Sequence, residues 1–267
     1  ISGYLLGFEN FAGLHGWQWL FLIEGAPACL LAFVILFVLP DGPAKASWLS
    51  ADEKREIETR LAAEPKPDHH ALLPMLADPR VWLLALPDFG IVISLYGLGL
   101  WLPQIVKAMG YTNIETGFIV AAPYLASMIG MVAVGISSDR SGERIYHVAV
   151  PALFAAAGMA AAAMLGQSVA AIVAMTVAMV GVYAALSVFW TLPPSFLGGT
   201  AAAGGIALIN SLSNLGGYFG PMLMGVLKHM TGGYAAGMLV LAGGLVAAAA
   251  LVTIIGTRAL APARAAR

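Results

Sequence analysis

Long apolar stretches separated by short polar connections occupy most of this chain. Windows of about 20 mainly apolar residues, the length at which a helix crosses a bilayer, recur seven times. They cover residues 19–39, 81–102, 117–136, 148–165, 169–192, 207–227 and 234–255. Residues 145–227 contain no Asp, Glu, Lys or Arg, and so long a charge-free stretch indicates several membrane-spanning helices. The pattern predicts an all-α polytopic membrane protein in a lipid bilayer.

Composition agrees with this pattern. Of 267 residues, 60% are hydrophobic and 10% are charged, against about 25% charged residues in a soluble domain. Cys29 is the single cysteine, so a disulfide within the chain is excluded, and we expect it to serve as a small hydrophobic side chain. The chain opens on Ile1 with a short apolar stretch and no basic leader. We therefore expect a truncated chain in which residues 1–14 are the outer end of an earlier helix and its following loop.

Basic residues fix the orientation of the predicted spans. When the spans are threaded alternately, eleven of the thirteen basic residues fall on one side, and only Lys107 and Lys228 fall on the other. Lysine and arginine concentrate in cytoplasmic loops. We therefore expect the long loop at residues 41–79 and the C-terminus to be cytoplasmic.

The long loop is the one strongly polar segment of the sequence. Ser50, followed by two acidic residues, predicts a helix that starts there and runs to about Ala63. The prolines that follow end it. A metal site at His69 and His70 is one interpretation, but adjacent histidines point apart and no third ligand clusters nearby. A solvated loop is favoured, and we expect neither a metal nor a cofactor.

A polar turn follows the span at residues 117–136. It has the pattern G-x-x-x-D-R-x-G-x-R, formed by Gly135, Asp139, Arg140, Gly142 and Arg144. One interpretation is that Arg140 and Arg144 are ordinary basic residues on the cytoplasmic side of the membrane, as the positive-inside rule expects, around a glycine turn. The other is a cytoplasmic latch, in which an acid and a base hold two helices together.

This pattern resembles the cytoplasmic-loop motif of the major facilitator superfamily, which lies between the second and third helices of each six-helix half. Glu143 stands where many members carry a base, and we expect it to weaken the latch. The resemblance implies a twelve-helix fold of two halves made of inverted repeats, of which this chain holds helices six to twelve. The implied parts are helix six at residues 15–40, an interdomain loop at 41–79, the second half at 80–257 and a cytoplasmic tail at 258–267.

Three further segments are similar to the anion:cation symporter branch of that superfamily. They are GWQWLFLIEGAP at residues 16–27, YGLGLWLPQ at 96–104 and GIALINSLSNLGGYFGP at 205–221. The resemblance implies proton-coupled uptake of a tartrate-like hydroxy acid, a sugar acid or an aromatic acid across a bacterial inner membrane. In this branch the proton-coupling carboxylates and the substrate-binding arginine lie in the first half, which we expect to be missing here. We expect no nucleic-acid partner.

Polar residues mark one face of the span at residues 207–227. Asn210, Ser213, Asn214, Gly217 and Pro221 recur at helical spacing. Amides both donate and accept, so Asn210 and Asn214 suit carboxylate and hydroxyl groups of a substrate. The alternative is polar bonding between neighbouring helices.

A second stripe lies on the preceding span. Tyr183, Ser187, Trp190 and Pro194 share one helical face, and the family resemblance places Ser187 and Trp190 beside the substrate. An interfacial tryptophan is the alternative for Trp190. Tyr96 is a third cavity candidate, whereas we expect nearby Trp101 and Gln104 only to anchor or gate.

Two carboxylates lie inside predicted spans, where an ionisable group is a functional hypothesis by default. Glu24 is close to the outer surface, and a structural bond to a neighbouring helix is favoured. Asp88 lies about 10 Å in from Val81 at 1.5 Å per residue. It is a candidate proton site, with a water-facing residue of the inner vestibule as the equal alternative.

Other function classes fit the sequence less well. An intramembrane enzyme needs paired acids, an activated nucleophile or a metal cluster within the spans, and none is found in the sequence. We expect no enzyme. A transporter-like sensor or a non-transporting subunit stays as the alternative to a transporter.

Overall fold

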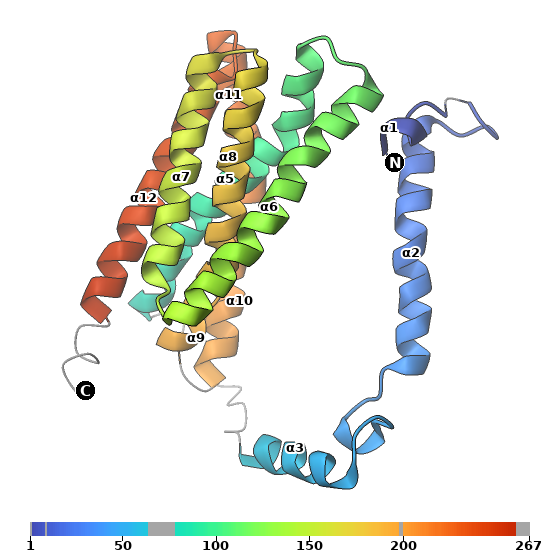
Figure 1. Cartoon of the computed structure of the whole chain (residues 1–267), viewed down its shortest axis with the longest axis vertical. Coiled ribbons are helices and arrows are strands. Elements are labelled where there is room, and N and C mark those ends of the chain that lie inside the picture. The colour runs from blue at the N-terminus through green and yellow to red at the C-terminus, as the bar shows by residue number, and fades with distance from the viewer. Residues whose placement is uncertain (1, 9, 64–77, 198–199, 260–267) are drawn as a thin grey trace. The chain divides into compact units, whose positions relative to one another are not determined.

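The chain forms helices in both of its compact units. The computed structural model describes residues 2–8, 10–63, 78–197 and 200–259, and Figure 1 shows their course. Contacts divide the chain into unit 1, Ile1–Pro67, and unit 2, Asp68–Arg267. Within the described ranges no strand forms beyond one isolated bridge between Phe11 and Leu14. The predicted all-α fold is confirmed.

Unit 1 contains one long apolar helix and one polar helix. Its elements are α1 (Ser2–Leu5), α2 (Gly16–Val38), the 3-10 turn η1 (Pro43–Lys45) and α3 (Ala51–Ala63). The predicted start of α3 is confirmed, because the Ser50 N–H donates to the Glu53 carboxylate at 2.9 Å and the Glu53 N–H donates back to Ser50 Oγ at 3.3 Å. Glu24 accepts a hydrogen bond from Ser2 Oγ at 2.5 Å, which is the helix-to-helix bond that the sequence favours. His69 and His70 lie outside the described residues.

Unit 2 is a helical bundle. Its helices are α5 (Pro79–Ala108), α6 (Asn113–Ser141), α7 (Ile145–Leu165), α8 (Val169–Phe189), α9 (Leu192–Phe196), α10 (Thr200–Asn214), α11 (Gly216–Thr231) and α12 (Ala235–Ala259). Polar caps set the starts of several helices, since the side chains of Asp78, Thr112 and Ser168 accept N–H bonds at the beginnings of α5, α6 and α8. Gly142 and Gly232 adopt left-handed backbone where α6 and α11 end.

Six helices in the described part of the chain are long and apolar enough to cross a membrane. Each contains or largely overlaps a predicted span. The prediction of one unbroken span at residues 207–227 is wrong, because that stretch is shared between α10 and α11, which meet at Leu215. The Leu215 N–H bonds to the carbonyl three residues back, at 3.2 Å, so the helix tightens there. Two glycines follow directly and weaken the helix further.

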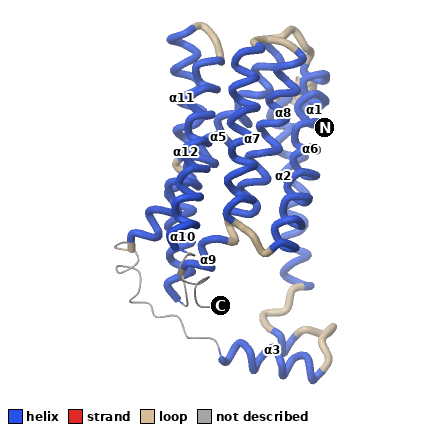
Figure 2. Tube along the Cα trace, turned by 60° about the vertical axis from the view of Figure 1, so that its left-hand side comes forward, coloured by secondary structure: helices blue, strands red, loops and turns tan. Residues whose placement is uncertain are grey.

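The helix α5 packs against α10, α11 and α12, while α8 packs against α6 and α7. In Figures 1 and 2 the long helices of unit 2 run close to a common direction, with α10 and α11 following one another along α5. Small residues allow close approach. A Cβ on Gly216 would lie 2.7 Å from the Ile93 nitrogen, and one on Gly220 would lie 2.9 Å from the Gly97 nitrogen. The close packing predicted from the G-x-x-x-G pattern is confirmed.

Candidate functional site

The two asparagines of α10 lie together on an exposed face. The Asn214 side-chain amide donates to the Asn210 backbone carbonyl at 2.9 Å and also to the Asn210 side-chain oxygen. Ser213 points the other way, since it is 1% exposed and donates to the Ile209 carbonyl at 2.8 Å. The predicted polar stripe is therefore split, with the amides on the open side of α10 and Ser213 packed inside the bundle.

Three tyrosines from three helices gather on unit 2. The rings of Tyr124 on α6 and Tyr183 on α8 meet edge to face, with centroids 6.2 Å apart. Tyr96 on α5 lies about one helical turn before Gly99, and a Cβ on Gly99 would stand 3.5 Å from the Tyr124 hydroxyl. The Tyr96 ring in turn lies 3.4 Å from where a Cβ on Gly217 would stand, so α11 is part of the same region. We name Tyr96, Tyr124 and Tyr183 the tyrosine cluster.

Sequence reasoning singled out Tyr96 and Tyr183 but missed Tyr124. Its span carries no polar stripe that would mark the face on which Tyr124 lies. The structure supplies the missing information, because the Tyr124 hydroxyl lies 3.5 Å from the position of a Cβ on Gly99 of α5. A glycine on the facing helix leaves room for this ring.

Ser187 and Trp190 lie farther along α8 and are both half-buried. Ser187 Oγ donates to the Ala184 carbonyl at 2.9 Å, and the Trp190 ring meets the Phe189 ring at 5.7 Å. Trp190 is the first residue after α8. Among the described residues, no hydrogen bond or ring contact joins Ser187 or Trp190 to the two asparagines.

Asp88 is fully buried in α5, at 0% exposure. Neither carboxyl oxygen has a hydrogen-bond partner within the described part of the chain. The prediction that Asp88 faces water in a vestibule is wrong for this conformation. The sequence could not decide this, because α5 is apolar on nearly every side and its periodicity does not show which face meets α10.

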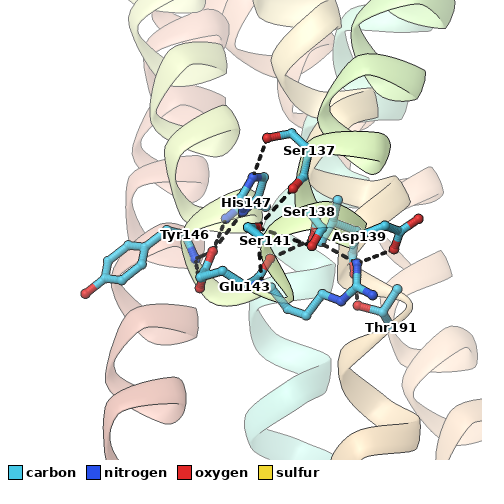
Figure 3. Close-up of polar contacts among 10 residues, drawn as sticks. Ser137, Ser138, Asp139, Ser141, Glu143, Tyr146, His147 and Thr191 are labelled. Carbon is cyan, nitrogen blue, oxygen red and sulfur yellow. Dashed lines mark hydrogen bonds and ion pairs between the residues drawn. The ribbon is translucent and has the colours of Figure 1, made fainter.

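The polar turn between α6 and α7 forms a compact network (Figure 3). Arg144 Nη1 lies 2.6 Å from Asp139 Oδ1 and donates to Ser138 Oγ at 2.9 Å. Ser138 is buried and donates to the Glu143 carbonyl at 2.7 Å. Asp139 and Arg144, two of the predicted latch residues, are thus joined across the turn at Gly142, whose φ is 66°.

Glu143 has a role that the sequence did not reveal. Its carboxylate accepts the N–H groups of Tyr146 and His147 at the start of α7, at 2.8 and 3.1 Å, and lies 2.9 Å from His147 Nδ1. His147 Nε2 lies 3.0 Å from Ser137 Oγ on α6. Desolvation raises the pKa of Glu143, but the bonds from Tyr146 and His147 outweigh it and leave the pKa lowered. Glu143 therefore caps α7. A basic side chain at this position would be unfavourable, because the N-terminus of a helix carries a partial positive charge.

The remaining predicted latch residues have no partner of this kind. Arg140 is exposed, and no hydrogen bond or ion pair engages its side chain among the described residues. A Cβ on Gly135 would meet nothing within 4 Å. Both residues face open space in this chain.

Trp101 anchors helices at the other end of the bundle, as the sequence predicts. Its indole N–H donates to the Pro221 carbonyl at 3.0 Å, which joins α5 to α11. Lys228 Nζ lies 5.0 Å from the Trp101 ring centroid and 4.6 Å from that of Tyr234. The described residues contain no group of three or more His, Cys, Asp or Glu that could hold a metal ion.

Comparison with known proteins identifies the family. Residues 2–221 match the family model described as Major Facilitator Superfamily. A protein of Agrobacterium vitis named "Putative tartrate transporter" is 43% identical over 261 residues, which are 97% of this chain and 60% of the relative. The "Quinolone resistance transporter" of Acinetobacter baumannii is 42% identical over 89% of this chain and 56% of its own length. "Inner membrane transport protein RhmT" of Escherichia coli K12 is 36% identical over 91% of this chain and 57% of its own.

These relatives are longer than the matched region. The chain spans about 60% of the length of two curated relatives from Agrobacterium vitis. The relatives therefore carry segments without a counterpart in these 267 residues.

Proposed function

Because this chain belongs to the major facilitator superfamily, we propose that it supplies the second half of a membrane transporter for small organic anions. The proposed substrate is a tartrate-like hydroxy acid, a sugar acid or an aromatic acid. The transporter is a multi-pass protein of a bacterial inner membrane with its C-terminus in the cytoplasm, and it is not an enzyme. The transport names of the relatives support this proposal.

The observation that carries the proposal is the exposed pair Asn210 and Asn214 on α10. An apolar membrane helix does not favour two adjacent amides on a lipid-facing surface. An amide offers two N–H donors and one acceptor oxygen, which match the carboxylate and hydroxyl groups of an organic acid. We therefore assign this face to the substrate pathway.

The tyrosine cluster extends the proposed wall. Its rings provide apolar contact surface, and its hydroxyls provide donors and acceptors. Ser187, Trp190 and Tyr96 complete the set of proposed substrate contacts. The described parts of α8, α9 and α10 carry no charged side chain, so this wall supplies no full positive charge. A cation that holds the substrate carboxylate would come from the other half of the transporter.

We further propose that uptake is driven by symport with protons and proceeds by alternating access of two halves around a midplane site. The first six-helix half is the partner that this mechanism requires. The pair Asp139 and Arg144 holds the α6–α7 turn in one shape, while exposed Arg140 is free to meet a neighbouring element as the halves move. Asp88 is the proposed proton site within this half.

A counterflow experiment tests the proposed function. Full-length protein is reconstituted into vesicles loaded with unlabelled acid, and entry of labelled tartrate, gluconate or 4-hydroxyphenylacetate is followed. We expect at least one acid to accumulate transiently without any ion gradient. Binding of an acid without counterflow would instead favour the sensor. If none of the three acids shows binding or counterflow, the proposed substrate class is refuted. Residues 1–267 alone should carry none of them, and uptake by this chain alone would refute the need for a partner half.

A further inference from the structure

The buried Asp88 is in an unfavourable position for a charged group. It is 0% exposed, and both of its carboxyl oxygens are without a hydrogen-bond partner among the described residues. An ionised carboxylate that is removed from water without such partners is strongly destabilised. The geometry therefore favours the neutral form of Asp88 in this conformation.

Ser213 on α10 lies on the face that packs against this part of α5. A Cβ on Gly205, about two turns before Ser213, would lie 3.5 Å from Val81 Cγ2, and Val81 lies two turns before Asp88. Ser213 Oγ donates to the Ile209 carbonyl at 2.8 Å, and neither Asp88 oxygen has a hydrogen-bond partner among the described residues. An ionised Asp88 would therefore destabilise the contact between α5 and α10, whereas a protonated Asp88 leaves it intact.

Among the described residues, no charged group bonds to the Asp88 carboxyl. The described residues of α8, α9 and α10 carry no charged or histidine side chain. On α5 itself, Arg80 is about 12 Å away along the axis, since it precedes Asp88 by eight residues. The charged residues of α6 lie in its first and last turns, and Lys228 of α11 is bound at Trp101, about 20 Å along α5 from Asp88.

The remaining titratable groups on helices that contact α5 form no hydrogen bond with the Asp88 carboxyl oxygens within the described part of the chain. They are Tyr96 and Lys107 on α5, Glu115, Tyr124, Asp139 and Arg140 on α6, Tyr183 on α8, Tyr218 and His229 on α11, and Arg258 on α12, whose side chain lies outside the described set. Asp88 is therefore the titratable group through which a proton can affect the contact between α5 and α10.

Leu215 separates α10 from α11. Its N–H bonds to the Leu212 carbonyl, and the Tyr218 N–H bonds to the Leu215 carbonyl. Helix α11 packs closely on α5, because Cβ atoms on Gly216 and Gly220 would meet the backbone of α5. A movement of α10 about Leu215 would leave that contact in place. Because α10 carries Asn210 and Asn214, such a movement would displace the proposed substrate amides.

We propose that Asp88 is a proton-binding site of the transport cycle, which holds α10 against α5 when it carries a proton and releases α10 when the proton leaves to water. This inference rests on the proposed function. When α10 moves away, water reaches the carboxylate, accepts the proton and solvates the charge. Because one helix carries both the proton-dependent contact and the substrate amides, proton and substrate binding must influence each other by linkage.

Two measurements on the full-length protein test this inference. The first compares counterflow with uptake driven by a pH gradient, using labelled tartrate, gluconate and 4-hydroxyphenylacetate as probes. Asp88→Asn resembles the protonated acid but cannot release a proton. It should lose gradient-driven accumulation. In that experiment the inside-to-outside concentration ratio of the substrate can reach about tenfold for each coupled proton at a gradient of one pH unit. Counterflow exchanges substrate through the protonated carrier and needs no net proton movement, so it should be retained, and its loss at equal membrane abundance would overturn the inference.

The matched control is Ser94→Ala. Ser94 is also fully buried on α5, where it donates to the Gly90 carbonyl at 3.0 Å, but it cannot titrate. This variant should keep both counterflow and gradient-driven accumulation. Loss of accumulation in Ser94→Ala to the same degree would show that any polar change in α5 has this effect, and would overturn the proton-specific role of Asp88.

The second measurement needs no substrate. Infrared difference spectra of the reconstituted protein should show the C=O stretch of a protonated carboxylic acid that disappears in Asp88→Asn and stays in Ser94→Ala. An Asp88 that is ionised at neutral pH, or an Asp88→Asn variant that still accumulates substrate, would overturn the inference. If wild-type protein carries none of the three acids, the proposed function fails for those acids, while the infrared band separately reports whether Asp88 holds a proton.

Discussion

The side-chain amide of Asn214 donates to the backbone carbonyl of Asn210 at 2.9 Å, one helical turn earlier on α10. The same amide also donates to the Asn210 side-chain oxygen, so Asn214 is oriented along the helix. The Asn214 side-chain oxygen and the Asn210 N–H donors remain for other partners, because both residues are exposed. The two side chains therefore form one oriented polar patch, and they should respond to mutation as a unit.

A double-mutant cycle tests this coupling. Asn210→Ala and Asn214→Ala should each lower the transport efficiency about tenfold or more, because a hydrogen bond to a charged group contributes about 1.5–3 kcal/mol. The double variant should lose less than the product of the single effects, with an interaction energy of at least ~0.5 kcal/mol. Strictly additive effects on initial uptake rates would show that the two amides act independently.

Trp190→Ala should reduce uptake of the transported acid several-fold while leaving membrane insertion unchanged, because truncation of the ring removes contact surface from the proposed wall. Trp190→Phe should keep much of the activity. Trp82→Ala, at the beginning of α5, serves as a control for an aromatic residue near the end of a span. Equal effects of Trp190→Ala and Trp82→Ala on uptake would support the interfacial role of Trp190 instead.

Acid should weaken the start of α7 through Glu143. The pKa of this carboxyl is lowered from its ordinary value of 4.5, so its stabilising contribution is present above that value and is lost as the pH falls through the lower, folded pKa. Glu143→Gln should reduce stability at pH 7 by roughly 0.5–2 kcal/mol, the range for loss of a helix cap. The variant should also lose less stability than wild type below pH 4.5.

Thermal unfolding of the detergent-solubilised full-length protein measures this effect across the pH range. Glu58→Gln, an exposed change on α3, is the control and should follow the wild-type pH dependence. Identical pH dependence of wild type and Glu143→Gln would show that the cap contributes nothing.

Gly220→Ala should destabilise the bundle, because a Cβ there would press against the backbone of Ile93 and Gly97. Overpacking of this kind typically costs about 1–3 kcal/mol. Gly243→Ala on α12 is the matched control, since a Cβ there meets nothing within 4 Å. Unfolding in mixed micelles should separate the two variants, and equal stability would contradict the tight contact between α5 and α11.

The helices were predictable from sequence because a bilayer demands uninterrupted apolar length. The division of residues 207–227 was not predicted, because the glycines that follow Leu215 indicate close helix packing as readily as a break. The burial of Asp88 was equally hidden, since nearly every face of α5 is apolar.

The candidate site was predictable only where one helix carried the whole signal. Asn210 and Asn214 are separated by one turn, so their pairing follows from spacing. The tyrosine cluster combines three helices, and Tyr124 joins it through tertiary packing that no local pattern encodes. In the α6–α7 turn, the family pattern marks Asp139 and Arg144, while the cap by Glu143 depends on the detailed start of α7.

The most direct test of the proposed substrate wall is the concentration dependence of counterflow for Asn210→Ala and for Gln167→Ala, an exposed amide in the α7–α8 turn. With an acid that the wild-type protein exchanges, Asn210→Ala should raise the half-saturating concentration or lower the rate about tenfold, at equal membrane abundance. Gln167→Ala should behave like wild type. Unchanged counterflow in Asn210→Ala would contradict the assignment of this face of α10 to the substrate.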